Sequence, residues 1–448
     1  MRVAVIGAGI IGVTTAYELA SDGHEVSVFE RQGTVAAETS FANAGVLAPG
    51  YVTPWAGPGM PAKVLGHLLS RHAPVRLRAG LSSGTVAWLW QWWRACRLRT
   101  YQANRLRMQR LAFFSRAHLH AVTQALQLDY EHSQGYLVLL RTAKDLALAQ
   151  PGLALLNPLT TRFQVLDAKQ CHAVEPGLNV DMPLHAGIHL PDDEAGNCRQ
   201  FAHLLRLQAQ ALGASFHFHT DVLSIQPGSA PRLVYGPSQA AARPSNKPRS
   251  AKAARREFAD TQHLPNEPTT ETFDAVVVCA AMGAGALLRP LGLKLPLLAV
   301  HGYSVTAPLR HNDHHPQGPR SALMDERYKV AISRLGNRVR VAGSAEIGGS
   351  LQRMDERTLK TLYKVLHDWF PGAAVMGQAQ VWKGARPMLP DGPPVLGASG
   401  KDGVWLNLGH GSSGWALSCG SARLLADLVV GRTPAIDTEG LGLERLRG

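Results

Sequence analysis

The pattern of hydrophobic and polar positions predicts an α/β chain that begins with a strand, a helix and a second strand. Val3 to Ile6 is a short apolar run, Ile10 to Ala20 repeats with helical spacing, and Glu25 to Phe29 alternates like a strand. A hairpin is predicted around Gly336 and Asn337. Similar patterns predict helices at 86–128, 168–174, 199–212 and 415–430, and strands at 135–141, 215–225, 273–279 and 404–408.

The order of these segments predicts two interleaved domains. Segments of the dinucleotide-binding kind occur at the start, near Asp274 and after Val404, with other material between them. The first domain is expected to comprise 1–85, 186–226, 273–290 and 390–448, and the second 86–185 and 291–389. Residues 227–272 are dominated by Pro, Ser, Ala, Arg and Lys, which predicts a low-complexity insertion without a packed core.

Composition narrows the class of protein. With 448 residues and 45% hydrophobic content, the chain can bury a large core. It has no apolar run of about 18 residues and enters a strand at once, so we expect a cytoplasmic chain without a secretory leader. The 5 cysteines are odd in number and include no Cys-x-x-Cys pair, so neither a disulfide framework nor a metal site is predicted.

The net charge of +13 is concentrated in one region. From Thr39 to Leu128 there is no Asp or Glu, and the same stretch contributes eleven Lys and Arg residues. Such a region favours an anionic partner: a lipid headgroup layer, a nucleic acid or an acidic protein. Trp88, Trp90, Trp92 and Trp93 fit either a helix lying on a membrane surface or a helix packed into the core.

A glycine motif follows the first strand and opens the first helix, which is the context of a dinucleotide-binding loop. Gly7 allows the tight turn, Gly9 lets the backbone approach a pyrophosphate, and Gly12 lets helix and strand pack closely. Glu30 ends the second strand, 18 residues after Gly12, where it can accept hydrogen bonds from a ribose. The residues expected to bind the cofactor are Gly7, Gly9, Ile10, Ile11, Gly12, Glu30 and Arg31. The motif alone leaves FAD and NAD open.

Further segments carry a resemblance to a known family. They include ETSFANAG at 38–45, GARPMLPDGPPV at 384–395 and GHGSSGW at 409–415, with others at 49–55, 71–74 and 325–332. Almost the whole chain resembles the D-amino acid oxidase superfamily of FAD-dependent oxidoreductases, most closely the small-subunit family of bacterial D-amino acid dehydrogenases. The resemblance implies non-covalently bound FAD on a Rossmann-type, glutathione-reductase-like domain. This domain is expected to be interleaved with an α+β substrate domain that contains a mostly antiparallel sheet.

The same resemblance implies which residues line the flavin. The further cofactor contacts it implies are Ser40, Asn43, Ala44, Gly45, Val222, Ala280, Gly409, Gly411 and Gly414. The last three stand between a strand and a helix, where amides and the helix dipole can face the flavin N1 and C2 carbonyl. His410, in the same loop, is either a catalytic base or a local hydrogen-bonding residue. At a position where the family usually has glycine, the glycine is either replaced by Ala281 or displaced to Gly283. A methyl group there would crowd the adenosine end of the cofactor, so either weaker FAD binding or a shifted loop is expected.

Arg386 is the expected substrate ligand. In the family an Arg-Pro pair before an Asp-Gly turn supplies a guanidinium that holds the substrate carboxylate with two hydrogen bonds. Tyr303 and Tyr328 match aromatic positions of the pocket wall, and each is alternatively a core tyrosine. With the carboxylate held, the Cα–H can point at flavin N5, and a hydride can transfer without a dedicated base.

The expected activity is oxidative deamination of a D-amino acid to a 2-oxo acid and ammonia, as in amino-acid catabolism. The resemblance implies a quinone-type or other electron acceptor and peripheral attachment to the cytoplasmic face of the inner membrane. Glycine, sarcosine and D-hydroxyproline are alternative substrates. A flavin domain acting on tRNA would suit the charge of +13, but the chain lacks an aromatic RNA-binding signature, so a nucleic-acid partner is not favoured.

Overall fold

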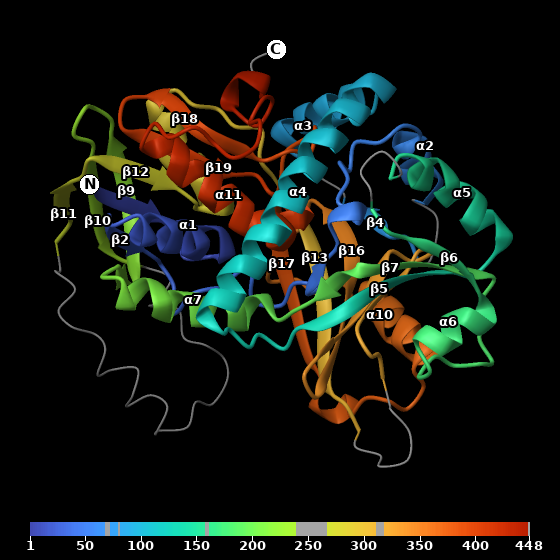
Figure 1. Ribbon diagram of the computed structural model, residues 1–448. Helices are drawn as coiled ribbons and strands as arrows, with labels where there is room; N and C mark the ends of the chain where they lie inside the picture. The colour runs from blue at the N-terminus through green and yellow to red at the C-terminus, as the bar shows by residue number, and fades with distance from the viewer. Residues whose placement is uncertain (68–71, 79–80, 157–160, 239–266, 311–317, 447–448) are drawn as a thin grey trace.

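Two large β-sheets lie beside each other in the computed structural model, with helices packed on them (Figure 1). The structure describes residues 1–67, 72–78, 81–156, 161–238, 267–310 and 318–446. One sheet has six strands and is built mainly from the two ends of the chain. The other has ten strands and comes mostly from the middle.

The six-stranded sheet is the core of a Rossmann-type domain. Its strands, in spatial order, are β18 (Val395–Lys401), β19 (Val404–Leu408), β12 (Ala275–Val278), β1 (Arg2–Ile6), β2 (Glu25–Phe29) and β8 (Ser215–His217). All neighbours are parallel except β18 and β19. Strands such as β1 and β12 are continuous runs of apolar residues because both faces of this sheet are covered.

Different elements cover the two faces of this sheet. Val3 and Val5 of β1 face a core shared with α1 (Ile10–Ser21), α7 (Cys198–Ala211) and α11 (Gly414–Val429). Ala4 and Ile6 face the opposite way, toward a three-stranded antiparallel sheet and α9 (Ala284–Leu288). The strands of that small sheet are β9 (Thr220–Gln226), β10 (Arg232–Pro237) and β11 (Thr269–Thr272).

The ten-stranded sheet is mostly antiparallel. Its main order is β17 (Gln380–Met388), β13 (Leu298–Pro308), β16 (Arg338–Ile347), β15 (Val330–Leu335), β14 (Ala322–Asp325), β5 (Ser133–Leu140), β7 (Ala186–Ala195) and β3 (Val46–Leu47), with β4 (Val75–Leu77) beside β16 and β6 (Gln164–Asp167) beside β7. Parallel pairs occur at β14–β5 and β16–β4. One face packs on α10 (Glu356–Trp369), which buries Trp369. The fold therefore has the predicted class, a Rossmann-type domain joined to an α+β part with a mostly antiparallel sheet.

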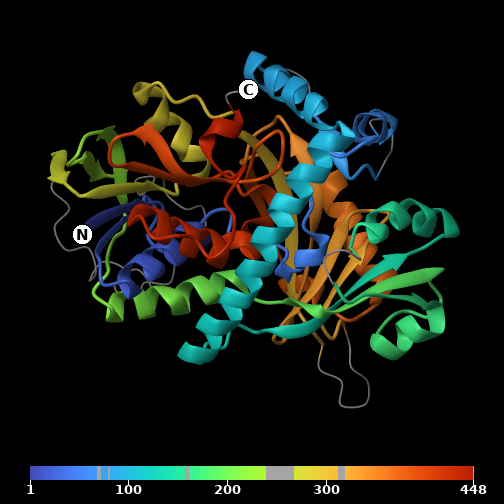
Figure 2. The same ribbon diagram turned by 45° about the horizontal axis from the view of Figure 1, so that its top comes forward.

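Further helices lie at the junction and around the second sheet. Their bounds are α2 (Met60–His67), α3 (Ser83–Ala95), α4 (Leu98–Leu126), α5 (Ala143–Ala154) and α6 (Ala168–Val174). The long helix α4 crosses between the two sheets (Figure 2). Its Leu111 and Leu119 are buried in the core around α1 and α11. This helix was assigned to the second domain by the sequence, but its apolar face packs on the first.

Several predicted elements are confirmed. The opening strand, helix and strand occur as expected, and β15 and β16 form the predicted hairpin around Gly336. Helix α6 begins after Asp167, whose carboxylate accepts a hydrogen bond from the backbone N–H of Gln170 at 2.8 Å. The long helical region divides into α3 and α4.

Three sequence predictions were wrong. The strand expected at 215–225 is broken into β8 and β9 at His219, which has a left-handed φ of 54°. Strand β7, placed in the first domain, pairs with β5 and β3 in the ten-stranded sheet. The insertion at 227–272 begins and ends with the ordered strands β10 and β11, because Leu233 is fully buried against the Rossmann sheet. Its middle, 239–266, lies outside the described residues.

Candidate active site

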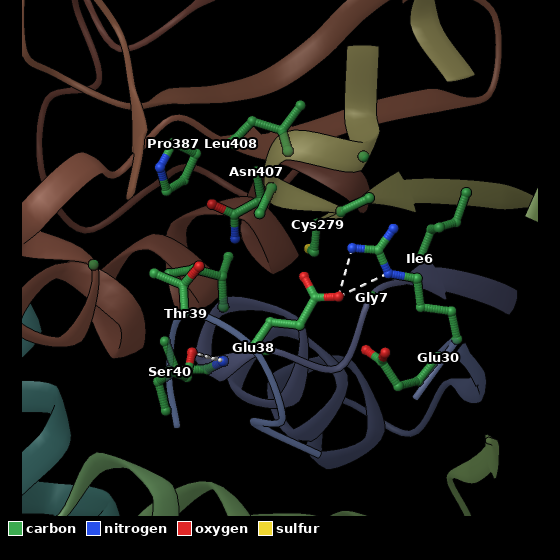
Figure 3. A pocket seen from close by; sticks show the side chains of 18 of the residues that line it. Ile6, Gly7, Glu30, Glu38, Thr39, Ser40, Cys279, Pro387, Asn407 and Leu408 are labelled. Atoms are coloured by element: carbon green, nitrogen blue, oxygen red, sulfur yellow. Dashed lines mark hydrogen bonds and ion pairs between the residues drawn. The ribbon is translucent and has the colours of Figure 1, made fainter. Parts of the chain in front are cut away.

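A cavity of about 280 Å³ lies at the carboxyl ends of the parallel strands (Figure 3). It is lined by the residues that end or follow β1, β2, β12 and β19, among them Gly7, Glu30, Ala280 and Gly409. Ligands of open α/β sheets bind outside the carboxyl ends of the strands, where the loops diverge. The cavity therefore lies where open α/β sheets of this kind bind a nucleotide.

The glycine motif forms one wall of this cavity. Gly7 has a φ of 99°, and a Cβ on it would lie 2.9 Å from the carbonyl oxygen of Cys279. Gly12 does not line the cavity, and a Cβ there would lie 1.8 Å from the Gly7 carbonyl oxygen, so it permits close packing of helix and strand. Helix α1 has neither an N-cap side-chain bond nor an acidic residue in its first turn. Its positive N-terminal end is thus left facing the cavity, which suits a phosphate.

Polar side chains surround the start of α1. Glu30 accepts hydrogen bonds from the backbone N–H groups of Ala8 at 2.7 Å and Gln32 at 2.8 Å. Burial raises the pKa of Glu30, and the two N–H groups oppose this effect. The Ser40 hydroxyl accepts from the Ile10 N–H at 3.0 Å. Glu38 and Arg31 also line the cavity, and the dashed lines at Glu38 in Figure 3 mark the hydrogen bonds that Arg31 donates to its carboxylate.

The loop before α11 closes the other end of the cavity. Gly409, Gly411 and Gly414 line it, and the first two have left-handed φ values of 80° and 57°. His410 is 3% exposed, and its Nε2 lies 2.9 Å from the Ser421 hydroxyl oxygen. Because the Ser421 hydroxyl donates to the carbonyl of Leu417, Nε2 of His410 must carry a proton and donate.

His410 is therefore held as a neutral, structural residue. Burial lowers its pKa to about 3, so the ring binds no second proton near neutral pH. A base needs a pKa near the working pH and a free lone pair aimed at the reacting proton. The placement of His410 favours the local hydrogen-bonding role over the catalytic one.

Arg386 lies on β17, one residue before Pro387, which lines the cavity. The Nη1 group donates to the carbonyl oxygen of Ser344 at 2.8 Å. In the described part of the chain, no carboxylate lies within 4.0 Å of this guanidinium, although most other half-buried arginines of the structure have one. Burial lowers the pKa of Arg386 to about 10, so it remains charged at neutral pH. A half-buried cation without a counter-ion suits an anionic ligand.

The two tyrosines predicted beside Arg386 lie on the opposite side of the sheet. Successive residues of β13 point to opposite faces, and Tyr303 points toward α10, where its hydroxyl donates to Glu346 at 2.5 Å. Tyr328 packs in the same core, with the Arg141 guanidinium 5.1 Å from its ring centroid. Neither tyrosine is placed to form the wall of a pocket at Arg386, so the core alternative describes them.

The chain matches the protein-family model for FAD dependent oxidoreductases over residues 2–428. It belongs to this family. The D-amino acid dehydrogenase of Rhizorhabdus wittichii is 40% identical over 447 residues, which cover 99% of this chain and 100% of the relative. The D-amino acid dehydrogenase of Cereibacter sphaeroides is 41% identical over 452 residues, covering 99% and 95%. Glycine oxidase from Geobacillus kaustophilus has a similar fold, with a TM-score of 0.71, 21% identity and coverage of 99% and 98%.

Family membership confirms an oxidoreductase that uses FAD, and the cavity fits that cofactor. Most of the predicted cofactor residues line it: Gly7, Gly9, Ile10, Ile11, Glu30, Arg31, Ser40, Val222, Ala280, Gly409, Gly411 and Gly414. The Asn407 Oδ1 atom, also at the cavity, is buried without a hydrogen-bond partner in the described structure. An unsatisfied buried acceptor in the wall of a nucleotide cavity is an expected ligand contact. That the chain corresponds to the small subunit of a D-amino acid dehydrogenase stays a prediction.

Three predicted flavin contacts do not line the cavity of this FAD dependent oxidoreductase. Asn43, Ala44 and Gly45 lie against the ten-stranded sheet, where the carbonyl oxygens of Asn43 and Ala44 accept from Arg340 at 3.0 Å and Ser333 at 2.7 Å. Asn407 was not predicted from the sequence, although an asparagine in the otherwise apolar strand VWLNL indicates a polar contact.

Proposed function

We propose that this FAD dependent oxidoreductase oxidises D-amino acids to 2-oxo acids and ammonia. The observation that carries the proposal is the uncompensated guanidinium of Arg386, next to a residue of the FAD cavity. A free α-carboxylate is the anion that every amino acid offers to such a group. The two relatives at about 40% identity over their whole length are named D-amino acid dehydrogenases, which favours the D-enantiomer.

Each part of the site then has a defined task. Arg386 binds the substrate carboxylate and so orients the Cα–H bond. Bound FAD supplies the hydride acceptor. The N-terminus of α11 directs its positive end into the cavity, which favours negative charge there. His410 stays neutral and holds the loop, so the amine of the substrate must provide the electron pair that forms the imine. Water then converts the imine to the 2-oxo acid and ammonia.

An anaerobic reduction screen tests the substrate class. The purified holoenzyme is mixed with D-amino acids, L-amino acids, glycine, sarcosine and D-hydroxyproline, and bleaching of the flavin absorbance is followed. D-amino acids should bleach it fastest. Faster bleaching by glycine or a secondary amine would replace the proposed substrate class, and no bleaching by any amino acid would overturn it.

Replacement of Arg386 tests the carboxylate contact. Arg386→Ala should lower kcat/KM by about 100-fold or more, since it removes two charge-assisted hydrogen bonds that contribute about 1.5–3 kcal/mol each. Arg289→Ala is the control, because Arg289 is exposed and has no salt bridge in the described structure. Equal kcat/KM values for the wild type and Arg386→Ala would remove Arg386 from the substrate site.

The exposed face of α3 supports a second part of the proposal, peripheral binding to an anionic membrane. Trp88 and Trp92 are buried at 3% and 6% exposure, whereas Trp90 and Trp93 are 58% and 51% exposed and contact each other. The helix therefore has one tryptophan pair in the core and one at the surface. Tryptophans beside basic residues are typical of helices that lie in the membrane interface.

The basic residues around α3 differ from others in the stretch from Thr39 to Leu128, which has no Asp or Glu, because they have no acidic partners among the described residues. Arg78, Arg110 and Arg116 bind carboxylates from distant parts of the chain, so much of the predicted positive surface is neutralised. Arg94, Arg97 and Arg99 are exposed and have no salt bridge in the described structure. None of the helices described is long and apolar enough to cross a bilayer. We infer that the surface formed by Trp90, Trp93, Arg94, Arg97 and Arg99 attaches the protein to the cytoplasmic face of a membrane.

A membrane location suits a lipid-soluble quinone as the electron acceptor. Sedimentation with vesicles rich in anionic lipid should capture the wild type at low salt and release it at high salt. Trp90→Ser together with Trp93→Ser should weaken capture, and a neutral vesicle is the control. Failure to sediment at low salt would overturn the membrane proposal. Reduction of a short-chain ubiquinone during D-amino acid turnover tests the acceptor, and electron transfer to oxygen alone would contradict it.

A further inference from the structure

Gly302 lies directly beneath the guanidinium group of Arg386. The two residues stand on neighbouring strands, where Gly302 of β13 pairs with Gly384 of β17 and Val300 pairs with Arg386. A Cβ atom on Gly302 would lie 2.3 Å from Nη2 and 2.5 Å from Cζ of Arg386. Since Cβ atoms do not approach other heavy atoms so closely, the guanidinium occupies space that any other residue at 302 would need.

A β-bulge turns the carbonyl of Ser344 toward the same guanidinium. The register of β13 and β16 shifts between His301 and Tyr303, so Gly302 faces two residues of β16. Ser344 has a φ of 64°, a conformation that serine rarely adopts, and its carbonyl accepts from Nη1 of Arg386 at 2.8 Å. Its hydroxyl oxygen is buried without a hydrogen-bond partner in the described structure, so the backbone alone makes the contact.

A buried ion cluster on the other face of the sheet holds this bulge. Glu346 follows Ser344 by two residues and is 1% exposed. Its carboxylate accepts from the Tyr303 hydroxyl at 2.5 Å, from Lys383 Nζ at 2.9 Å and from Arg78 Nη2 at 3.2 Å. Since these partners come from β13, β17 and the segment after β4, they join β16 at the bulge to the adjacent β13, to β17 beyond it and to the β4 segment.

We propose that Gly302 and the Ser344 bulge are positioning elements, which set the guanidinium of Arg386 for the substrate carboxylate. Gly302 provides the space, and the Ser344 carbonyl binds Nη1, which leaves the other N–H groups directed for a ligand. The inference rests on the proposed function, because it assigns these residues to the carboxylate site. Gly302 and Ser344 act through Arg386 and need no contact with the substrate.

Gly302→Ala is the direct test. The atoms that a Cβ would meet are the far end of a flexible side chain, so the fold can accommodate the methyl group by displacing the guanidinium. The KM for D-amino acids should rise on the order of 10- to 100-fold, the range of one lost charge-assisted interaction, while kcat changes less. Calorimetric binding of D-lactate, which has the carboxylate but no amine, should weaken by a similar factor. FAD content and the thermal unfolding midpoint should stay close to the wild-type values.

Three variants separate positioning from a general structural effect. Gly377→Ala makes the same change where a Cβ would have no heavy atom within 4 Å, and should leave KM and D-lactate affinity unchanged. Ser344→Gly removes the hydroxyl but keeps the left-handed conformation, so it should behave like the wild type. In an Arg386→Ala background, Gly302→Ala should have no further effect on either quantity.

The outcomes distinguish this inference from the proposed function. If Arg386→Ala leaves D-lactate binding and kcat/KM intact, the carboxylate site itself is wrong. If Arg386→Ala impairs both but Gly302→Ala does not, only the positioning role of Gly302 is overturned. An equal loss from Gly302→Ala with and without Arg386 would show that the methyl group acts through the fold and not through the guanidinium.

Discussion

Arg423 joins the two helices whose N-termini face the FAD cavity. From α11 it binds Glu18 of α1 at 2.8 Å, Asp22 at the end of α1 at 2.5 Å, and Asp427 at 2.9 Å. The carboxylates of Glu18 and Asp427 are 5% and 7% exposed. Arg423→Met keeps much of the side-chain volume and leaves these buried negative charges without their main partner.

The expected loss follows from that geometry. Breaking a buried ion pair by removing one partner destabilises a protein by about 3–5 kcal/mol. Arg432→Met is a matched control, because Arg432 binds the same Asp22 and Asp427 at 3.3 and 2.9 Å but is 51% exposed. A pair of that exposure contributes about 0–1 kcal/mol. Comparison of the two variants therefore separates the stability contribution of the buried arginine from that of the exposed one.

The stability that Arg423→Met loses should depend on pH, and it should become smaller only toward acidic pH. Burial raises the pKa of Asp22, but its hydrogen bonds and charge interactions with Arg423 and Arg432 outweigh this, so the pKa lies below the ordinary 3.8. A lowered carboxyl pKa stabilises the fold above pH 3.8 and loses that contribution as the pH falls through the folded value. The difference between wild type and Arg423→Met should be constant around neutral pH and narrow only in acid.

Urea unfolding, followed by circular dichroism and by release of flavin fluorescence, measures these differences. Arg423→Met should unfold and release FAD at a lower urea concentration than either the wild type or Arg432→Met. If the two methionine variants have equal midpoints, burial does not decide the strength of these pairs. If Arg423→Met unfolds earlier but retains FAD to the same concentration of urea, α1 and α11 are not coupled through this arginine.

Two further predictions concern backbone strain and pH. Ala281→Gly should raise the thermal midpoint, because Ala281 has a φ of 45°. Relief of about 1–2 kcal/mol of left-handed strain exceeds the entropy penalty of about 0.4–1 kcal/mol for glycine. A lower midpoint would contradict this. His132→Gln should destabilise the protein more at about pH 6 than at about pH 9, because the hydrogen bond to Glu194 raises the pKa of His132 above 6.5 and its stabilisation is lost as the pH rises through the folded value. A loss independent of pH would remove the ionic contribution of His132.

Local chemistry made the nucleotide site predictable. Gly7, Gly9 and Gly12 act through turn geometry and close packing that depend on neighbouring residues, so their spacing along the chain is enough to predict the cofactor loop. The charged surface was less predictable. Arg110 binds Asp437, which is 327 residues away, and no local pattern reveals such a partner. For the same reason β7 was assigned to the wrong sheet, since strand pairing depends on distant segments.

The two faces of β13 show why the proposed substrate site was only partly predictable. Side-chain alternation along a strand predicts that Gly302 and Tyr303 point to opposite faces of the sheet, but not which of these faces carries Arg386. The family pattern directed attention to the tyrosine, while the residue that lies under Arg386 has no side chain at all. A glycine carries no functional group, so the space that Gly302 leaves for the guanidinium is apparent only in the structure.

Arg340 provides a comparison for Arg386. Both guanidiniums lack a salt bridge in the described structure, and burial lowers the pKa of each to about 10. Arg340, however, donates to the Thr306 hydroxyl at 2.9 Å and to the Asn43 carbonyl at 3.0 Å, so it joins the sheet to the loop at Asn43. Arg386 has one protein hydrogen bond in the described structure, from Nη1 to Ser344. The proposed carboxylate contact uses the other donors of Arg386, whereas those of Arg340 join parts of the fold.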